Sequence, residues 1–192
     1  MTIFSRKPTC PYCKNPLETT PKRKAKCPHC GKWIYVRKGE MLKEDDAQIL
    51  DWLVFLDKYG ITKQKIESSR NDLSKKFKAK ASVHDTIWFI LNSLVTTKPE
   101  QAFYEMARLA NQEGKDAQSY IEQALRTQLN SYKLRGIKTV RVVGYAEEPD
   151  YSTCPDCVKL LCKKFPIDEA LEKMPIPRSC TSGWCRCGYE PA

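Results

Sequence analysis

The residues of this chain best suited to chemistry are its cysteines, which gather in two separate parts of the sequence. The 192 residues include ten cysteines, and none of them lies between Cys30 and Cys154. The sequence shows no signal peptide and no apolar run of about eighteen residues, so we expect a protein of the cytoplasm or another reducing compartment. Disulfides are rare there, and closely spaced cysteine pairs usually bind metal.

The first group has the spacing of a structural zinc site. Thirteen residues separate the two C-x-x-C pairs, CPYC and CPHC, which contain Cys10, Cys13, Cys27 and Cys30. Each C-x-x-C turn can direct two sulfurs at one tetrahedral ion. Gly31 follows the second pair, where a tight turn often needs a positive φ angle. The run WIYV at 33–36 then predicts a short strand. This order of turn, linker, turn and strand resembles a zinc ribbon over about thirty residues.

The second group contains more thiols than one zinc ion needs. They occur in CPDC, in VKLLCKKF and in SCTSGWCRC, and are Cys154, Cys157, Cys162, Cys180, Cys185 and Cys187. We predict a second zinc held by Cys154, Cys157, Cys180 and either Cys185 or Cys187, with Cys185 preferred. Cys162 lies on an expected helix and is predicted to pack as a core thiol. Two other interpretations stay open, a set of buried thiols and an iron–sulfur cluster.

Helices are expected between the two cysteine groups. Asp45 or Asp46 can begin a helix that Gly60 ends, and Thr62 can cap the next one. Ser82 and Asp85 resemble a capping box. Further helices are expected from Pro99 and between Asp116 and Gly136, followed by a β-branched strand at 137–145. The predicted fold is therefore α+β and mainly helical, with a basic zinc ribbon (1–40), a helical bundle (41–115) and a helix–strand–zinc module (116–192).

The last segment also resembles a known family over about residues 116–190. A helix ending in Tyr132-x-x-x-Gly136 is followed by a valine-rich strand, Asp150 before CPDC, the sequence FPIDEAL and a proline-rich step into CRC. This order resembles the C-terminal core of Mu-type phage head-morphogenesis proteins. Where that family usually has a histidine and Pro-Asn, this chain has Cys180 and Gly183-Trp184. The resemblance implies a role in a phage or prophage particle, with phage structural proteins as partners and a virion location.

The positive charge is concentrated at the N-terminus. The formal net charge is +10, and residues 1–38 hold ten Lys or Arg and one acid. Cations beside the aromatic rings of Trp33 and Tyr35 suit a phosphate backbone and its bases. We therefore predict nucleic-acid binding, to DNA or RNA, through six residues: Lys22, Arg23, Lys24, Lys26, Lys32 and Arg37. An acidic protein surface as the partner, or a basic loop that is simply solvated, are the alternatives.

The sequence gives no reason to expect catalysis. It lacks a phosphate-binding G-x-x-x-x-G-K-[ST] loop, a G-x-S-x-G turn and an H-E-x-x-H helix. An HNH-like nuclease would need a histidine near the second cysteine group, and residues 137–192 contain none. We predict a non-enzymatic zinc protein, with neither a small-molecule substrate nor a membrane partner, that binds nucleic acid or helps to assemble a particle.

Overall fold

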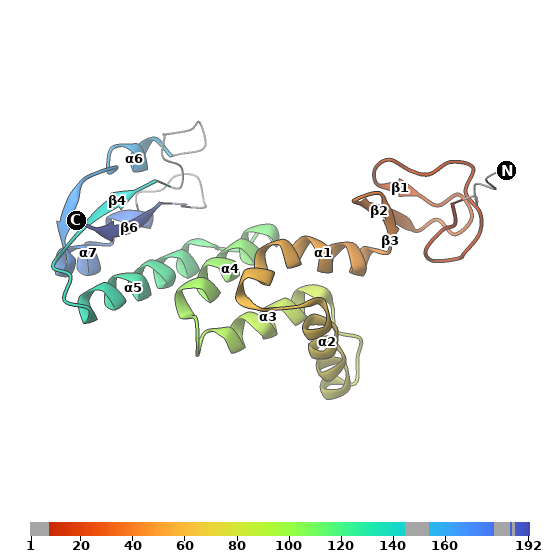
Figure 1. Ribbon diagram of the computed structural model, residues 1–192, viewed down its shortest axis with the longest axis horizontal. Coiled ribbons are helices and arrows are strands. Elements are labelled where there is room, and N and C mark those ends of the chain that lie inside the picture. The colour runs from red at the N-terminus through yellow and green to blue at the C-terminus, as the bar shows by residue number, and fades with distance from the viewer. Residues whose placement is uncertain (1–7, 145–153, 179–184, 186) are drawn as a thin grey trace, which may run out of the picture. The chain divides into compact units, whose positions relative to one another are not determined.

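The computed structural model combines helices with two small antiparallel sheets (Figure 1). It describes residues 8–144, 154–178, 185 and 187–192. The chain divides into two compact units, Met1–Ile87 and Trp88–Ala192, rather than into the three segments expected from the sequence. The difference arises because residues 99–112 form a helix that packs on the helix after it, and so belong to the second unit.

The first unit begins with a three-stranded sheet. Its strands are β1 (Ala25–Lys26), β2 (Trp33–Arg37) and β3 (Glu40–Leu42), in the order β1-β2-β3 with antiparallel neighbours. Strand β2 lies where the WIYV run predicted it. The sheet has a very small core, formed by Leu17 and Ile34 together with Cys10 and Cys27. So few buried apolar side chains leave this segment dependent on a further stabilising element.

Helices complete the first unit. They are α1 (Glu44–Leu56), the short 3₁₀ helix η1 (Asp57–Tyr59), α2 (Lys63–Phe77) and the first residues of α3 (Val83–Leu94). Thr62 caps α2 by accepting from the backbone N–H of Lys65, and Ser82 accepts from that of Asp85, so both predicted caps are confirmed. The predicted cap of α1, Asp45 or Asp46, was wrong by two or three residues: its N-cap is Lys43. Asp45 and Asp46 lie within the first turn, where their charge favours the helix dipole.

The second unit is built around the antiparallel pair α4 (Pro99–Gln112) and α5 (Gln118–Leu134). Pro99 occupies the first turn of α4, as predicted. The Asp116 carboxylate accepts from the backbone N–H of Gln118 at 2.8 Å, and Gly136 has a φ of +79° just beyond α5. The apolar side chains that face the core recur every three or four residues along α5: Ile121, Ala124, Leu125 and Leu129.

A second sheet packs against α5. Its central strand is β4 (Thr139–Val143), with β5 (Lys164–Pro166) and β6 (Gly188–Pro191) on either side in antiparallel pairing. Val140 and Val142 point into the core and are fully buried. Three short helices connect these strands: α6 (Pro155–Val158), α7 (Ile167–Lys173) and α8 (Pro175–Arg178).

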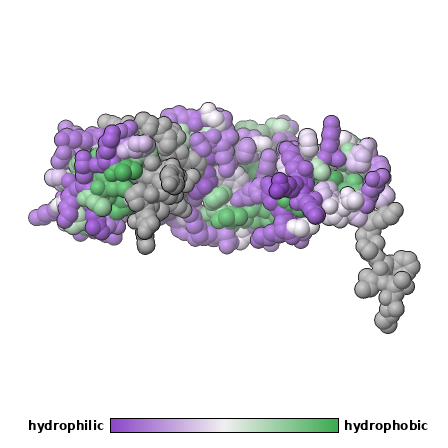
Figure 2. All heavy atoms as spheres, turned by 90° about the horizontal axis from the view of Figure 1, so that it is seen from above, coloured by the Kyte–Doolittle hydropathy of each residue, from purple (hydrophilic) through white to green (hydrophobic). Residues whose placement is uncertain are grey.

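The visible surface is largely hydrophilic, with hydrophobic residues in smaller patches between hydrophilic ones (Figure 2). Among the described residues, no helix is both long enough and apolar enough to span a bilayer.

Candidate metal centres

The N-terminal cysteine site consists of Cys10, Cys13, Cys27 and Cys30, whose sulfur atoms all lie within 4.8 Å of one another. The Cys10 and Cys30 sulfurs are 3.9 Å apart, as are those of Cys13 and Cys27. A tetrahedral ion with metal–sulfur bonds of about 2.3 Å would separate its ligands by about 3.8 Å. A disulfide needs about 2.05 Å. The four sulfurs therefore have the spacing of one metal site, and the predicted ligand set comes together as expected.

Two similar turns position these four sulfurs. In the first, the N–H of Lys14 donates to the carbonyl of Cys10, and the N–H of Cys10 donates to the carbonyl of Asn15. In the second turn the pattern is the same: the N–H of Gly31 donates to the carbonyl of Cys27, and the N–H of Cys27 donates to the carbonyl of Lys32. The residue after each pair has a positive φ, +63° at Lys14 and +70° at Gly31. The requirement predicted at Gly31 is confirmed, and Lys14 meets the same requirement with a side chain that gave no signal in the sequence.

The electrostatics of the first turn favour a thiolate. Burial raises the pKa of Cys10, but hydrogen bonds from the backbone N–H groups of Cys13 and Tyr12, together with those from the Cys27 and Cys13 side chains, lower it to about 7. The N–H of Tyr12 points at the Cys10 sulfur over 3.4 Å. Metal binding requires the deprotonated sulfur, so these backbone donors help to prepare the ligand. His29 is exposed, and its Nε2 lies 3.0 Å from the carbonyl oxygen of Pro16 rather than among the cysteine sulfurs.

The C-terminal cysteine site consists of Cys154, Cys157, Cys185 and Cys187, which share one buried core cluster. The sulfurs of Cys157, Cys185 and Cys187 lie within 4.8 Å of one another, and those of Cys157 and Cys185 are 3.8 Å apart. Hydrogen bonding from the Cys185 thiol lowers the pKa of Cys187 to about 7, against burial and the nearby charge of Cys154. The four residues form a second group that can hold a metal ion.

Both cysteines of the CRC motif reach this site, where the sequence led us to choose between them. Cys187 immediately precedes β6. The pairing of β6 with β4 determines where Cys187 lies relative to the CPDC turn. Cys157 lies on α6, whose first turn repeats the bond seen at the other site: the N–H of Val158 donates to the carbonyl of Cys154 at 3.0 Å. Cys180, the remaining predicted ligand, lies outside the described residues.

The prediction for Cys162 was wrong. Helix α6 ends at Val158, so VKLLCKKF is not a continuous helix, and Cys162 is exposed with a φ of +62°. Its N–H donates to the carbonyl of Val142, which places it at the entry to β5. The turn after α6 is needed to reverse the chain into β5, and a side chain at that position points to solvent rather than into a core.

Tyr189 anchors the C-terminal site to the helices. Its ring is buried, and its hydroxyl donates to the carbonyl of Ile176 at 3.3 Å. Its backbone N–H donates to the side-chain oxygen of Gln128, and its carbonyl accepts from the Tyr132 hydroxyl at 3.2 Å. Tyr189 is two residues from Cys187, so these bonds hold the end of the CRC segment against α5. No motif in the sequence predicted this role.

The predicted nucleic-acid residues lie on the N-terminal module, which comprises the first cysteine site and the sheet β1–β3 (residues 8–42), in two different situations. Lys22, Arg23, Lys24, Lys26 and Lys32 are exposed, and the Lys24 ammonium lies 4.9 Å from the ring centre of Trp33 and 4.7 Å from that of Tyr35. Arg37 instead forms a bidentate ion pair with Asp51 of α1, with both N–O distances at 2.7 Å. Its charge is already matched within the protein.

No family model, curated protein or solved structure matches this chain.

Proposed function

We propose that the chain is a zinc protein without catalytic activity that contacts nucleic acid through its basic N-terminal module, a zinc ribbon. The observation that carries the metal assignment is the close grouping of cysteine sulfurs at two sites, four at the N-terminal site and three at the C-terminal site, where Cys154 lies in the same buried cluster. Four thiolates in a tetrahedral arrangement favour Zn²⁺ among the common cellular ions. Bound zinc stabilises the small N-terminal core, which is too limited to be stable by apolar burial alone.

The donor sets support a structural role for the metal. A catalytic zinc keeps one position open for water or substrate, whereas four cysteines fill all four positions. Both sites can be completed by protein sulfur alone, so neither needs a solvent ligand. On this proposal the metal organises the fold, and recognition depends on the surface that the metal supports.

The exposed cations of the N-terminal module support nucleic acid as the partner. Lys22, Arg23 and Lys24 lie close together in sequence, and none has a carboxylate partner among the described residues. Lysines over aromatic rings combine charge for phosphates with flat surfaces for bases. Arg37 is not part of the proposed contact surface because its guanidinium is already paired with the Asp51 carboxylate. The five lysine and arginine residues that remain are the proposed contact surface.

Salt titration of binding tests this function. The probe is a labelled DNA duplex, and the variant is Lys22→Gln/Arg23→Gln/Lys24→Gln. Each lost phosphate contact should lower the slope of log affinity against log salt by about 0.9. The matched control removes three exposed lysines of the second unit, as Lys138→Gln/Lys163→Gln/Lys164→Gln. Equal losses in both triple variants would mean that only net charge matters, and an affinity that does not change with salt would contradict the proposal.

A second candidate role is in assembly of a phage-like particle. It is supported by the order of elements in the second unit, where helix α5, strand β4, CPDC and CRC follow one another and the cysteines of the two motifs meet. This order is the basis of the resemblance to Mu-type head-morphogenesis proteins. Co-sedimentation separates the two roles, since an assembly component should travel with particles and a nucleic-acid adaptor should remain in the supernatant.

A further inference from the structure

A pocket in the first unit lies beside the N-terminal cysteine site. Its volume is about 560 Å³, and it is formed by the first cysteine turn, strand β2, the start of α1 and the loop before α3. Seven residues line it: Tyr12, Lys32, Trp33, Lys43, Glu44, Asp45 and Lys80. The pocket therefore lies between the N-terminal cysteine module and the helical part of the same unit.

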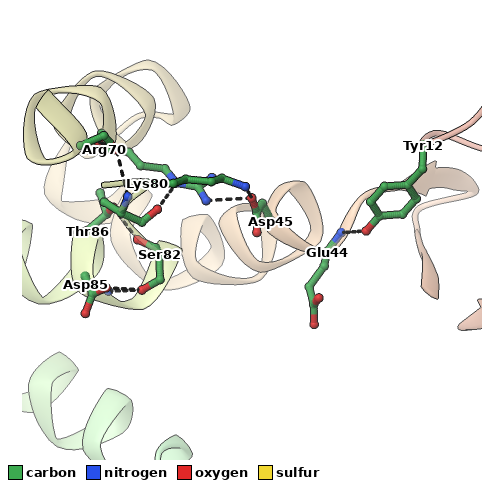
Figure 3. A network of polar contacts seen from close by, with 10 residues as sticks. Tyr12, Glu44, Asp45, Arg70, Lys80, Ser82, Asp85 and Thr86 are labelled. Atoms are coloured by element: carbon green, nitrogen blue, oxygen red, sulfur yellow. Dashed lines mark hydrogen bonds and ion pairs between the residues drawn. The ribbon is translucent and has the colours of Figure 1, made fainter. Parts of the chain in front are cut away.

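Polar contacts fix the walls of this pocket (Figure 3). The backbone N–H of Glu44 donates to the Tyr12 hydroxyl at 2.8 Å. On the other side, Arg70 at 2.7 Å and Lys80 at 2.9 Å converge on one carboxylate oxygen of Asp45. The Lys80 and Arg70 contacts lower the pKa of Asp45 despite its partial burial. These bonds hold the floor in place before any ligand arrives.

The cations around the pocket outnumber its acids. Asp45 is paired with both Arg70 and Lys80, and the Glu44 carboxylate keeps its charge while it accepts from the neutral Tyr35 hydroxyl at 2.8 Å. Lys32 and Lys43 are exposed and have no carboxylate partner in the described part of the chain. The pocket therefore offers unmatched positive charge to an incoming anion.

The pocket also presents an aromatic surface. Trp33 is 48% exposed, an unusual state for the largest apolar side chain. The Lys32 ammonium lies 5.1 Å from the centre of the Tyr12 ring, so a cation and a flat ring stand together at the opening. A planar group can stack on Trp33 while an attached anion meets Lys32 or Lys43.

We infer that this pocket receives an unpaired nucleobase and its adjoining phosphate, so that the protein prefers single-stranded nucleic acid to duplex. The inference rests on the proposed function and specifies its ligand. In a duplex the faces of the bases are stacked inside the helix, and only the phosphates can reach the lysines. In a single strand each base can leave its neighbours and stack on an aromatic side chain.

The test compares Trp33→Leu with Trp33→Tyr. The probes are an oligothymidylate of about 12 nucleotides and a duplex of the same length, measured by fluorescence anisotropy at one salt concentration. Trp33→Leu keeps an apolar side chain but removes the ring, and should weaken single-strand binding by about tenfold with little change for the duplex. Trp33→Tyr keeps a ring and should restore most of the affinity. Zinc content and circular dichroism establish that each variant is folded.

Lys43→Gln provides a second test that leaves Trp33 in place. It should lower the salt slope for the single strand by about 0.7, and Lys138→Gln in the second unit is its control. If Trp33→Leu weakens both probes equally or neither, or if an acidic peptide competes as well as the oligonucleotide, the pocket inference is wrong. Salt-dependent binding to the lysines would then still support the proposed function. If the unchanged protein binds neither probe at low salt, the proposed function fails as well.

Discussion

The hydroxyl of Tyr12 accepts a hydrogen bond from the backbone N–H of Glu44 over 2.8 Å. Tyr12 lies between the two ligands of the first cysteine turn, and Glu44 is the first residue of α1. The first N–H groups of a helix have no partner inside the helix. The side chain of the N-cap residue Lys43 accepts a hydrogen bond from none of these N–H groups. The Tyr12 hydroxyl, which belongs to the N-terminal module, accepts from one of them. The bond thereby couples the cysteine site to the helical part of the first unit.

Replacing Tyr12 by Phe should destabilise the first unit without releasing metal. The loss of one hydrogen bond to a helix N-terminus should lower the free energy of unfolding by about 1 kcal/mol. Denaturant titration in the presence of zinc measures this change, and elemental analysis measures the metal. The contrasting variant is Cys27→Ser, which should lose one zinc equivalent and the fold of the module while the second unit stays folded. Loss of zinc from the Phe variant would show that Tyr12 supports the ligands themselves.

Lys14→Gly should stabilise the N-terminal module. Lys14 holds a φ of +63°, which strains a residue with a Cβ atom, and glycine at the equivalent position of the second turn avoids this strain. The expected gain is about 0.5–1 kcal/mol, measured as a higher melting temperature at fixed zinc concentration.

The reciprocal substitution, Gly31→Ala, is the control for this argument. A Cβ atom at Gly31 would meet only the end of the Lys26 side chain, at 3.9 Å. The new methyl group therefore fits, and the cost should come from the backbone angle alone, at about 1 kcal/mol. A neutral effect at Gly31 together with no gain at Lys14 would contradict the equivalence of the two turns.

Metal content should separate Cys187 from Cys162. Cys187→Ser should remove one zinc equivalent, because its sulfur belongs to the buried group with Cys157 and Cys185. Cys162→Ser should keep the full metal content, because that thiol is exposed at a turn. Elemental analysis decides both cases. In the unchanged protein Cys162 should react rapidly with a thiol reagent, whereas the metal-bound cysteines should react only after a chelator is added.

Glu100→Gln should stabilise the second unit at neutral pH. Burial raises the pKa of Glu100, opposed by Arg135 and by the hydrogen bond from Gln128. A carboxyl with a higher pKa in the folded chain than in the unfolded chain weakens folding once it is ionised. The difference between variant and unchanged protein should therefore be fully present above the folded pKa of Glu100. It should shrink as the pH falls toward the unfolded value of about 4.3.

Parallel denaturation curves of the two proteins across this pH range measure the effect. Release of metal at acidic pH affects both proteins alike and cancels in the comparison. A Gln variant that is less stable than the unchanged protein at neutral pH would mean that the Glu100 charge is stabilising, through Arg135, and that burial is the smaller influence.

The sequence predicted local features of this fold better than its division into units. The cysteine spacing, the caps at Thr62 and Ser82 and the turn at Gly31 each depend on a few neighbouring residues, and each is present. Helix α4 could pack on α5, which follows it, or on the helices before it, and long-range contacts decide between the two. No short motif encodes that choice.

The candidate metal sites show the same limit. The first site has its four ligands within about twenty residues, and its members could be named from spacing. The second combines CPDC with cysteines some thirty residues later, and which of them take part depends on the register of β6 on β4. Phe77 is a further example: it follows Ile66 and Leu73 at helical spacing along α2, yet it is 65% exposed while they are buried. Only the course of the neighbouring elements determines where such a stripe ends.

The pairing of β6 with the central strand β4 has a consequence for the order of events during synthesis. The first unit has all its cysteine ligands by residue 30, so it can take up metal while the remainder of the chain is still being translated. The sheet and the metal site of the second unit need residues from Thr139 to Pro191 together. Until the ribosome has added Tyr189, the valines of β4 and the four buried cysteines of this site lack the cover of β6. A nascent chain stalled before that point would expose an apolar strand and reactive thiols.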